Sequence, residues 1–236
     1  MSTGEARQGG TPLKVGLMVP ANNTTMEVEL AAWLPAGSTV TTVKIPRGQG
    51  LLTKETLPAY RDSAITLARE HFADGKHDLI AYGCTAAGFM AGPQRDAEVA
   101  AEISGLTGKP VVTTASAMTA ALEDLGARRV TVVTPYLDPV NERLKAFIEA
   151  SGIAVENLAS FRAETVDALA AITPAQIVDL ARTAMSPASD AMFIACSQLP
   201  ARAILGDLER EFGRPVWSSI RATAWAAERQ LVTNGR

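Results

Sequence analysis

The fold is decided by two similar stretches of sequence, DLIAYGCT at residues 78–85 and DAMFIACS at residues 190–197. Each stretch begins with an aspartate, continues through five apolar or small residues, and ends with a cysteine and a hydroxyl residue. An apolar run of this length is typical of a buried strand. The sequence has 2 cysteines in all, so both of its thiols follow such a strand at matching positions.

Two further pairs of segments repeat at nearly the same separation along the chain. GKPVVTT at 108–114 resembles GRPVWSS at 213–219, and VGLMVP at 15–20 resembles VTVVTP at 130–135. One interpretation is that all strand–helix units look alike. Because three pairs share nearly one offset, we favour the other interpretation, in which one structural unit occurs twice.

Short apolar runs alternate with longer amphipathic stretches, which is typical of parallel strands joined by crossover helices. We therefore predict an α/β fold of two similar Rossmann-like halves, each with a parallel sheet, related by a pseudo-twofold axis. The first half is expected at 13–117 together with a C-terminal helix at 222–236, the second at 118–221, and a disordered leader at 1–12. Strands are expected at 15–19, 39–45, 78–83, 110–114, 129–134, 153–158, 190–195 and 215–218. Helices are expected at 25–34, 57–72, 93–105, 116–125, 138–150, 174–185, 199–212 and 220–233.

Composition excludes several classes of function. The 236 residues are 47% hydrophobic and carry a net charge of -3, so a large core is expected and a basic surface for nucleic acid or an anionic membrane is not. No apolar run approaches the ~20 residues of a membrane span. The polar leader does not resemble an export signal, and two unpaired thiols suit a reducing compartment, so we expect a cytoplasmic protein.

The two cysteines are the strongest candidates for catalysis. Ligands of open parallel sheets bind beyond the carboxyl ends of the strands, so the pseudo-twofold places Cys84 and Cys196 on opposite walls of one cleft. The free N–H groups of the following helices would favour thiolate. One thiol could then attack or remove a proton while the other delivers a proton from the opposite face. The alternative is that both are small, buried core residues.

Other chemistries find little support in the sequence. His71 and His77 fall near a helix end and in a loop, and we expect both at the surface. There is no dinucleotide or phosphate-loop motif and no Cys-x-x-Cys pair. We therefore expect no cofactor and no metal.

Four motifs carry a family resemblance: VPANNTTME at 19–27, YGCT at 82–85, VTPY at 133–136 and ACSQLP at 195–200. Through them the chain resembles the aspartate/glutamate racemase superfamily and, within it, the branch of maleate cis-trans isomerases and arylmalonate decarboxylases. The resemblance covers Val15 to about Arg229. It implies catalytic roles for Cys84 and Cys196. It also implies substrate binding by Asn23, Thr85, Tyr136 and Ser197.

This resemblance implies a cofactor-independent isomerase of a small mono- or dicarboxylate, with maleate to fumarate as the leading reaction and Cys84 as the nucleophile. Arylmalonate decarboxylases carry glycine where Cys84 stands, which places decarboxylation third, after racemisation of an amino acid (aspartate or glutamate) or a hydantoin. A carboxylate-binding protein without turnover is the non-enzymatic alternative. The resemblance also allows a homo-oligomer.

Two departures distinguish the chain from the maleate isomerases. These enzymes usually have an apolar residue where Thr85 stands, and they tend to supply an asparagine from the segment after the sixth strand, whereas residues 161–169 contain none. Lys44, Arg47 and Arg162 could hold a carboxylate instead, but we expect each at the surface.

Overall fold

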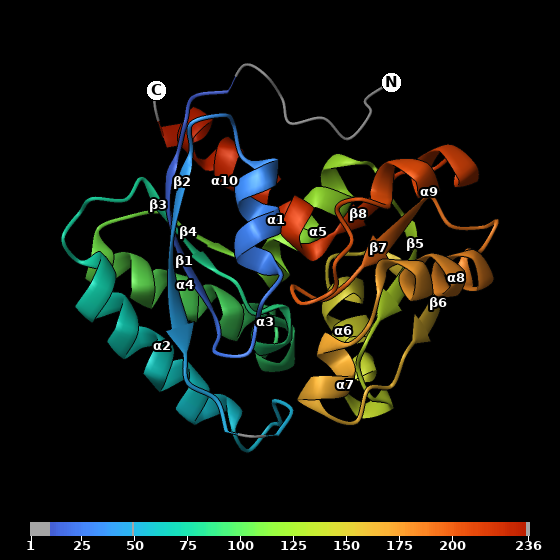
Figure 1. The fold of residues 1–236 in the computed structure, drawn as a ribbon, viewed down its shortest axis with the longest axis horizontal. Helices are drawn as coiled ribbons and strands as arrows, with labels where there is room; N and C mark the ends of the chain where they lie inside the picture. The colour runs from blue at the N-terminus through green and yellow to red at the C-terminus, as the bar shows by residue number, and fades with distance from the viewer. Residues whose placement is uncertain (1–9, 49, 235–236) are drawn as a thin grey trace.

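The computed structural model describes residues 10–48 and 50–234, and its core is two four-stranded parallel sheets (Figure 1). The first sheet has the strand order β2-β1-β3-β4 and the second has β6-β5-β7-β8. The two orders are equivalent, so the α/β fold with two similar halves is confirmed. The strands are β1 (Lys14–Pro20), β2 (Thr39–Ile45), β3 (Leu79–Tyr82), β4 (Val111–Thr113), β5 (Arg129–Thr134), β6 (Ala154–Ser160), β7 (Ala191–Ile194) and β8 (Val216–Ser218).

Ten helices occur in the described part of the chain, and eight of them match the predicted ones. They are α1 (Met26–Trp33), α2 (Leu57–Phe72), α3 (Thr85–Ala91), α4 (Pro93–Thr107), α5 (Thr114–Asp124), α6 (Asp138–Glu149), α7 (Val166–Ala170), α8 (Pro174–Ala184), α9 (Leu205–Phe212) and α10 (Ser219–Asn234). The short helices α3 and α7 were not predicted. Neither is long enough to show a helical repeat of apolar residues.

The helix predicted at 199–212 begins only at Leu205. The segment before it is held by the first half of the chain instead. The side chain of Gln198 accepts a hydrogen bond from the N–H of Thr24 at 3.0 Å, and the N–H of Arg202 donates to Glu29 at 3.0 Å. These bonds to loop and helix residues of the first half replace the first turn of the predicted helix.

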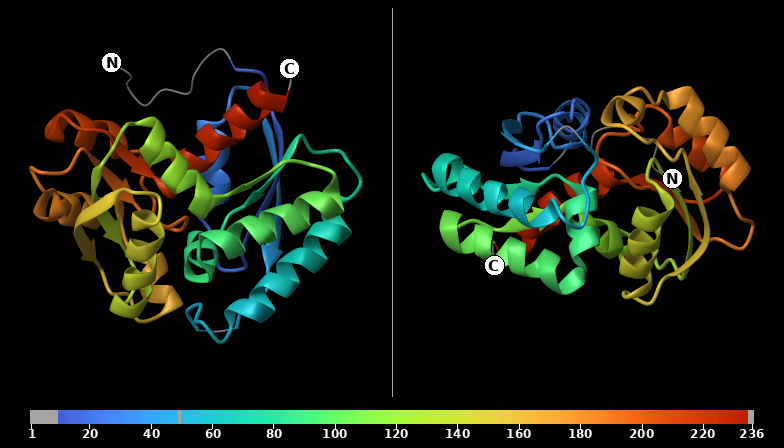
Figure 2. Two further views of the ribbon diagram at one scale, coloured as in Figure 1. Left: turned by 180° about the vertical axis from the view of Figure 1, so that it is seen from behind. Right: turned by 90° about the horizontal axis from the view of Figure 1, so that it is seen from below.

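Two apolar clusters hold the layers together. Helices α2 and α4 lie side by side on the outer face of the first sheet (Figure 2), where Phe72 and Ile103 pack against Met18 and Ile80. The other cluster joins the opposite face of this sheet to the whole second half. Because one continuous core spans both sheets, the surfaces that face each other between them are fixed relative to one another.

Helix α10 follows β8 of the second sheet but packs along α5 and also contacts α1. The predicted domain boundary between residues 117 and 118 falls inside α5, and the division of the chain into domains stays a prediction. Residues 1–9 of the predicted leader lie outside the described residues. Within the described ranges, no helix combines the length and apolar character that crossing a bilayer requires.

The aspartate at the start of each repeated stretch precedes β3 or β7 and accepts hydrogen bonds from the backbone at the start of the neighbouring strand, β1 or β5. Asp78 accepts a hydrogen bond from the N–H of Lys14 at 2.7 Å, and Asp190 accepts from the N–H groups of Arg128 and Arg129, both at 2.9 Å. These two donors hold the pKa of Asp190 below its ordinary value. The repeated aspartate therefore has a structural function, whereas the repeated cysteine lines the cleft described below.

Candidate active site

One cleft between the halves contains both cysteines. Its empty space is about 660 Å³ when the open solvent at its mouth is included. Segments that follow β1, β2 and β3 line one side, and segments that follow β5, β6 and β7 line the other. The lining residues are Pro20, Asn22, Asn23, Arg47, Leu51, Leu52, Cys84, Thr85, Ala86, Pro135, Tyr136, Leu137, Val140, Ala163, Val166, Leu169, Cys196, Ser197 and Gln198.

Local backbone geometry brings Cys84 to the cleft. Strand β3 ends at Tyr82, and Gly83 then passes so close to β1 that an added Cβ would lie 2.8 Å from the carbonyl oxygen of Met18. Cys84 follows in an extended conformation as the N-cap residue of α3. Cys196 also lies just after its strand, β7, but the next helix begins only at Leu205, and the Cys196 sulfur accepts the N–H of Gln198 at 3.4 Å.

Both thiols are buried, and burial raises the pKa of each. For Cys84 this effect is opposed by the N–H of Ala87, the Tyr60 hydroxyl and the Arg47 guanidinium. For Cys196 it is opposed mainly by the nearby Tyr136 hydroxyl. We expected N–H groups beside each cysteine to favour thiolate, and backbone N–H groups do lower the pKa of both thiols. The N–H groups act in the predicted direction, but the loss of hydration outweighs them.

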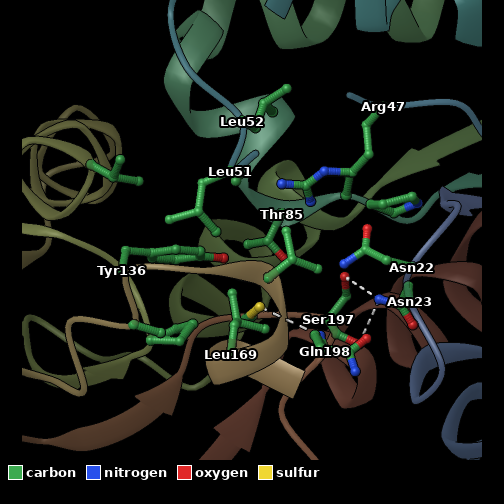
Figure 3. Close-up of a pocket in the computed structure, with 18 of the residues that line it drawn as sticks. Asn22, Asn23, Arg47, Leu51, Leu52, Thr85, Tyr136, Leu169, Ser197 and Gln198 are labelled. Carbon is green, nitrogen blue, oxygen red and sulfur yellow. Dashed lines mark hydrogen bonds between the residues drawn. The ribbon is translucent and has the colours of Figure 1, made fainter. Parts of the chain in front are cut away.

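Asn23 and Ser197 bind each other across the cleft. The Asn23 amide donates to the carbonyl oxygen of Ser197 at 3.1 Å and to its hydroxyl at 3.2 Å (Figure 3). The Ser197 hydroxyl in turn donates to the carbonyl oxygen of Gly83 at 2.9 Å. The Asn23 carbonyl oxygen accepts the N–H groups of Thr25 and Met26 at the start of α1. These two predicted binding residues thus also join the halves.

Four polar groups in the cleft are buried without a nitrogen or oxygen hydrogen-bond partner among the described residues, and the last of them, the Tyr136 hydroxyl, lies against the Cys196 thiol. They are the carbonyl oxygen of the Asn22 side chain, Nε of Arg47, the hydroxyl of Thr85 and the hydroxyl of Tyr136. Figure 3 shows the Arg47, Thr85 and Tyr136 groups pointing towards the same central space. Leaving a buried polar group unpaired costs about 1–3 kcal/mol, so four such groups around one space indicate a site for a polar ligand.

Arg47 and Asn22 are two of the polar lining residues that sequence reasoning did not assign to the site. Arg47 was expected at the surface, but it is half-buried and lines the cleft. Asn22 lies two residues after the end of β1, and Arg47 lies two residues after the end of β2. The rule that located the cysteines, namely that ligands bind beyond the carboxyl ends of parallel strands, would also have located these two residues.

The rest of the cleft is apolar. Leu51 and Leu52 come from the loop after β2, Val140 comes from α6, and the segment after β6 contributes Val166 and Leu169. A substrate therefore meets both polar groups and hydrocarbon in this cleft.

In the described part of the chain, no three His, Cys, Asp or Glu side chains lie close enough together to hold a metal ion. His71 is exposed as expected. His77 is buried, contrary to expectation, because its ring packs edge-on against Phe72 at 4.9 Å.

The fold and the site together define a class of α/β protein in which each of two similar halves contributes one cysteine to a shared cleft. A profile of the arylmalonate decarboxylase family matches residues 15–236, and the chain belongs to this family. The predicted branch is thereby confirmed.

Similar proteins include both activities of this branch. The maleate isomerase of Geobacillus stearothermophilus is 26% identical over 92% of this chain and 91% of its own. The arylmalonate decarboxylase of Bordetella bronchiseptica is 33% identical over 77% of this chain and 76% of its own.

Solved structures agree with these relatives. The maleate isomerase Iso from Pseudomonas putida S16 has a TM-score of 0.86 at 28% identity, covering 95% of this chain and 94% of that one. A cysteine-to-serine mutant of the Nocardia farcinica maleate cis-trans isomerase, with a covalently bound succinylcysteine intermediate, has a TM-score of 0.86 at 27% identity, covering 94% of each chain.

Proposed function

We propose that the protein is a cofactor-independent isomerase that converts maleate to fumarate through a covalent adduct on Cys84. The observation that carries this proposal is the pair of buried cysteines lining one cleft between the two halves. Similarity to maleate isomerases over nearly the whole chain supports it, as does the succinylcysteine found in one of them.

The reaction uses the two thiols in turn. The Cys84 thiolate adds to C2 of maleate, and the electron pair of the double bond moves to C3, where the Cys196 thiol supplies a proton. The adduct is a succinyl thioether whose C2–C3 bond is single and free to rotate. Cys196, now a thiolate, removes a proton from C3, the double bond re-forms in the trans arrangement, and the Cys84 thiolate leaves.

Four residues are proposed to hold the carboxylates. The Thr85 hydroxyl is buried without a partner among the described residues, so it has a hydrogen bond to donate, and the buried Tyr136 hydroxyl lies beside the Cys196 thiol at the same cleft. Asn23 and Ser197 line the same cleft, but their side chains already bind each other. A carboxylate that binds to Asn23 therefore has to replace the bond between Asn23 and Ser197.

The test is proton NMR of the purified protein with maleate. We expect the vinyl signal of maleate to be replaced by that of fumarate. In the Cys196→Ser variant, peptide mass spectrometry should find a mass increase of one maleic acid molecule on Cys84. Untouched maleate, together with deuterium uptake at the α-carbon of aspartate, glutamate or a hydantoin in D2O, would replace isomerisation with racemisation. A cleft that binds carboxylates without turning any over would indicate a binding protein.

A second candidate is decarboxylation of an aryl-substituted malonate. The apolar wall formed by Leu51, Leu52, Val140, Val166 and Leu169 favours it, because maleate has no apolar substituent to cover that wall. The relative with 33% identity is an arylmalonate decarboxylase. Release of carbon dioxide from phenylmalonate, with maleate left unchanged, would favour this candidate.

The location and assembly of the protein are further proposals. Both cysteines are free, and the thiol mechanism requires them to stay reduced, which favours the cytoplasm. A homo-oligomer stays a prediction that light scattering of the purified protein would test.

A further inference from the structure

We propose that Arg47 binds one carboxylate of the substrate and makes the cleft selective for dicarboxylates over monocarboxylates. This inference rests on the proposed function, since it assigns the second carboxylate of that substrate to a side chain. Arg47 is also one of the three cationic residues that were expected at the surface from the sequence.

Arg47 carries a positive charge at the cleft but has no carboxylate partner among the described residues. One of its terminal amino groups donates to the carbonyl oxygen of Gly50 at 2.9 Å, while its Nε is buried without a partner. None of the ion pairs in the described part of the chain involves Arg47. Because a half-buried charge is costly without a counter-ion, this guanidinium is suited to an anionic ligand.

The opposite wall cannot provide the same contact. The segment that follows β6 contributes Ala163, Val166 and Leu169 to the cleft, all of them hydrocarbon. A dicarboxylate therefore finds no amide there, whereas Arg47 offers two parallel N–H donors that match a carboxylate.

The other candidate cations are occupied elsewhere. The ammonium group of Lys44 donates to the carbonyl oxygen of Asn23 at 2.5 Å, and Arg162 forms an ion pair with Asp138 at 2.8 Å. Neither residue lines the cleft, and Arg47 is the one charged residue among those described as lining it. Its charge also favours the thiolate of Cys84. One substrate carboxylate is thus assigned to Arg47 and the other to the four residues already proposed to hold carboxylates, Asn23, Thr85, Tyr136 and Ser197.

The test measures binding without turnover. Isothermal calorimetry compares succinate, a saturated dianion, with butyrate, a monoanion of the same chain length, on wild-type protein and on Arg47→Gln, Arg47→Lys and Arg95→Gln. Arg95 is an exposed arginine of α4 paired with Glu98 and serves as the matched control. Far-UV circular dichroism and melting curves verify that each variant is folded.

We expect Arg47→Gln to weaken succinate binding about 10- to 100-fold, which corresponds to one charge-assisted hydrogen-bonding pair. Butyrate binding should change less than about threefold, and Arg47→Lys should recover part of the loss because it retains the charge but not the planar fork. With maleate, Arg47→Gln should raise KM more than it lowers kcat.

Three results would overturn the assignment: equal succinate affinity in Arg47→Gln and wild type, an equal loss for succinate and butyrate, or no succinate binding by the wild type. Because calorimetry does not depend on turnover, the assignment survives if maleate is not isomerised but Arg47→Gln still loses succinate selectively. In that case the proposed reaction fails and the dicarboxylate site stands.

Discussion

Replacing Thr85 with valine should make the protein more stable and less active at the same time. Thr85 is 1% exposed, and its hydroxyl has no hydrogen-bond partner among the described residues. A buried hydroxyl without a partner costs about 1–3 kcal/mol, and valine has nearly the same shape. We expect the free energy of unfolding to rise by about 1 kcal/mol, which for a chain of this size is a melting temperature higher by roughly 2–4 °C.

Activity should move in the opposite direction. If the Thr85 hydroxyl donates to a substrate carboxylate, its loss removes a hydrogen bond to a charged group, worth about 1.5–3 kcal/mol. The value of kcat/KM for maleate should then fall about 10- to 150-fold. The assays are thermal unfolding without ligand and initial rates of fumarate formation.

Thr131→Val is the matched control. Thr131 is a fully buried threonine of β5 whose hydroxyl is hydrogen-bonded to that of Ser189 at 2.8 Å and accepts the N–H of Ser186 at 3.2 Å. This variant should lose about 1–3 kcal/mol of stability because both partners are left unpaired. If Thr85→Val is destabilised as much as Thr131→Val, the Thr85 hydroxyl has a partner in the folded protein and the reasoning is refuted.

Four other predictions concern the thiols, pH, cofactors and backbone. Cys84→Ala and Cys196→Ala should each lower turnover at least about 100-fold with the fold retained, and full activity of either variant would contradict the two-thiol reaction. Since burial raises the pKa of Cys84, the initial rate should rise with pH from about 6 to 9 as more of the thiol becomes thiolate. A flat profile over this range would contradict the prediction. Exhaustive treatment with EDTA should leave the rate unchanged, whereas a loss restored by zinc or magnesium would show that the enzyme needs a metal. Gly83→Ala should cost about 1–3 kcal/mol of stability, because the new Cβ would lie 2.8 Å from a backbone oxygen, while Gly105→Ala, where the Cβ meets open space on exposed α4, should be neutral or stabilising.

The strands and the two cysteines could be predicted because their signals are local and repeated. Strands β3 and β7 are unbroken apolar runs, and a cysteine follows each after one residue, so the pattern near residues 84 and 196 already indicates the edge of the sheet. The rule for parallel sheets then brings both thiols to one cleft without any knowledge of side-chain packing.

Other features depended on distant contacts. The late start of α9 follows from bonds between Gln198 and Thr24, which are far apart in the sequence. The raised pKa of Cys84 results from its burial in the cleft between the halves, and burial of this kind cannot be predicted from neighbouring residues in the sequence. Arg47 resembles a surface arginine in sequence, and only the absence of a carboxylate beside it in the folded chain distinguishes it.

The near-symmetry of the two halves has a consequence for selectivity between the two faces of a substrate. Two identical subunits meeting at a strict twofold axis would have to present the same groups to both faces. Here each half could diverge separately because both belong to one chain. The wall around Cys84 carries Arg47, while the wall around Cys196 carries Tyr136 and the hydrocarbon of Leu169. A substrate that is itself symmetric, such as maleate, therefore enters surroundings in which its two ends are no longer equivalent, and one end is marked for attack before any bond has changed.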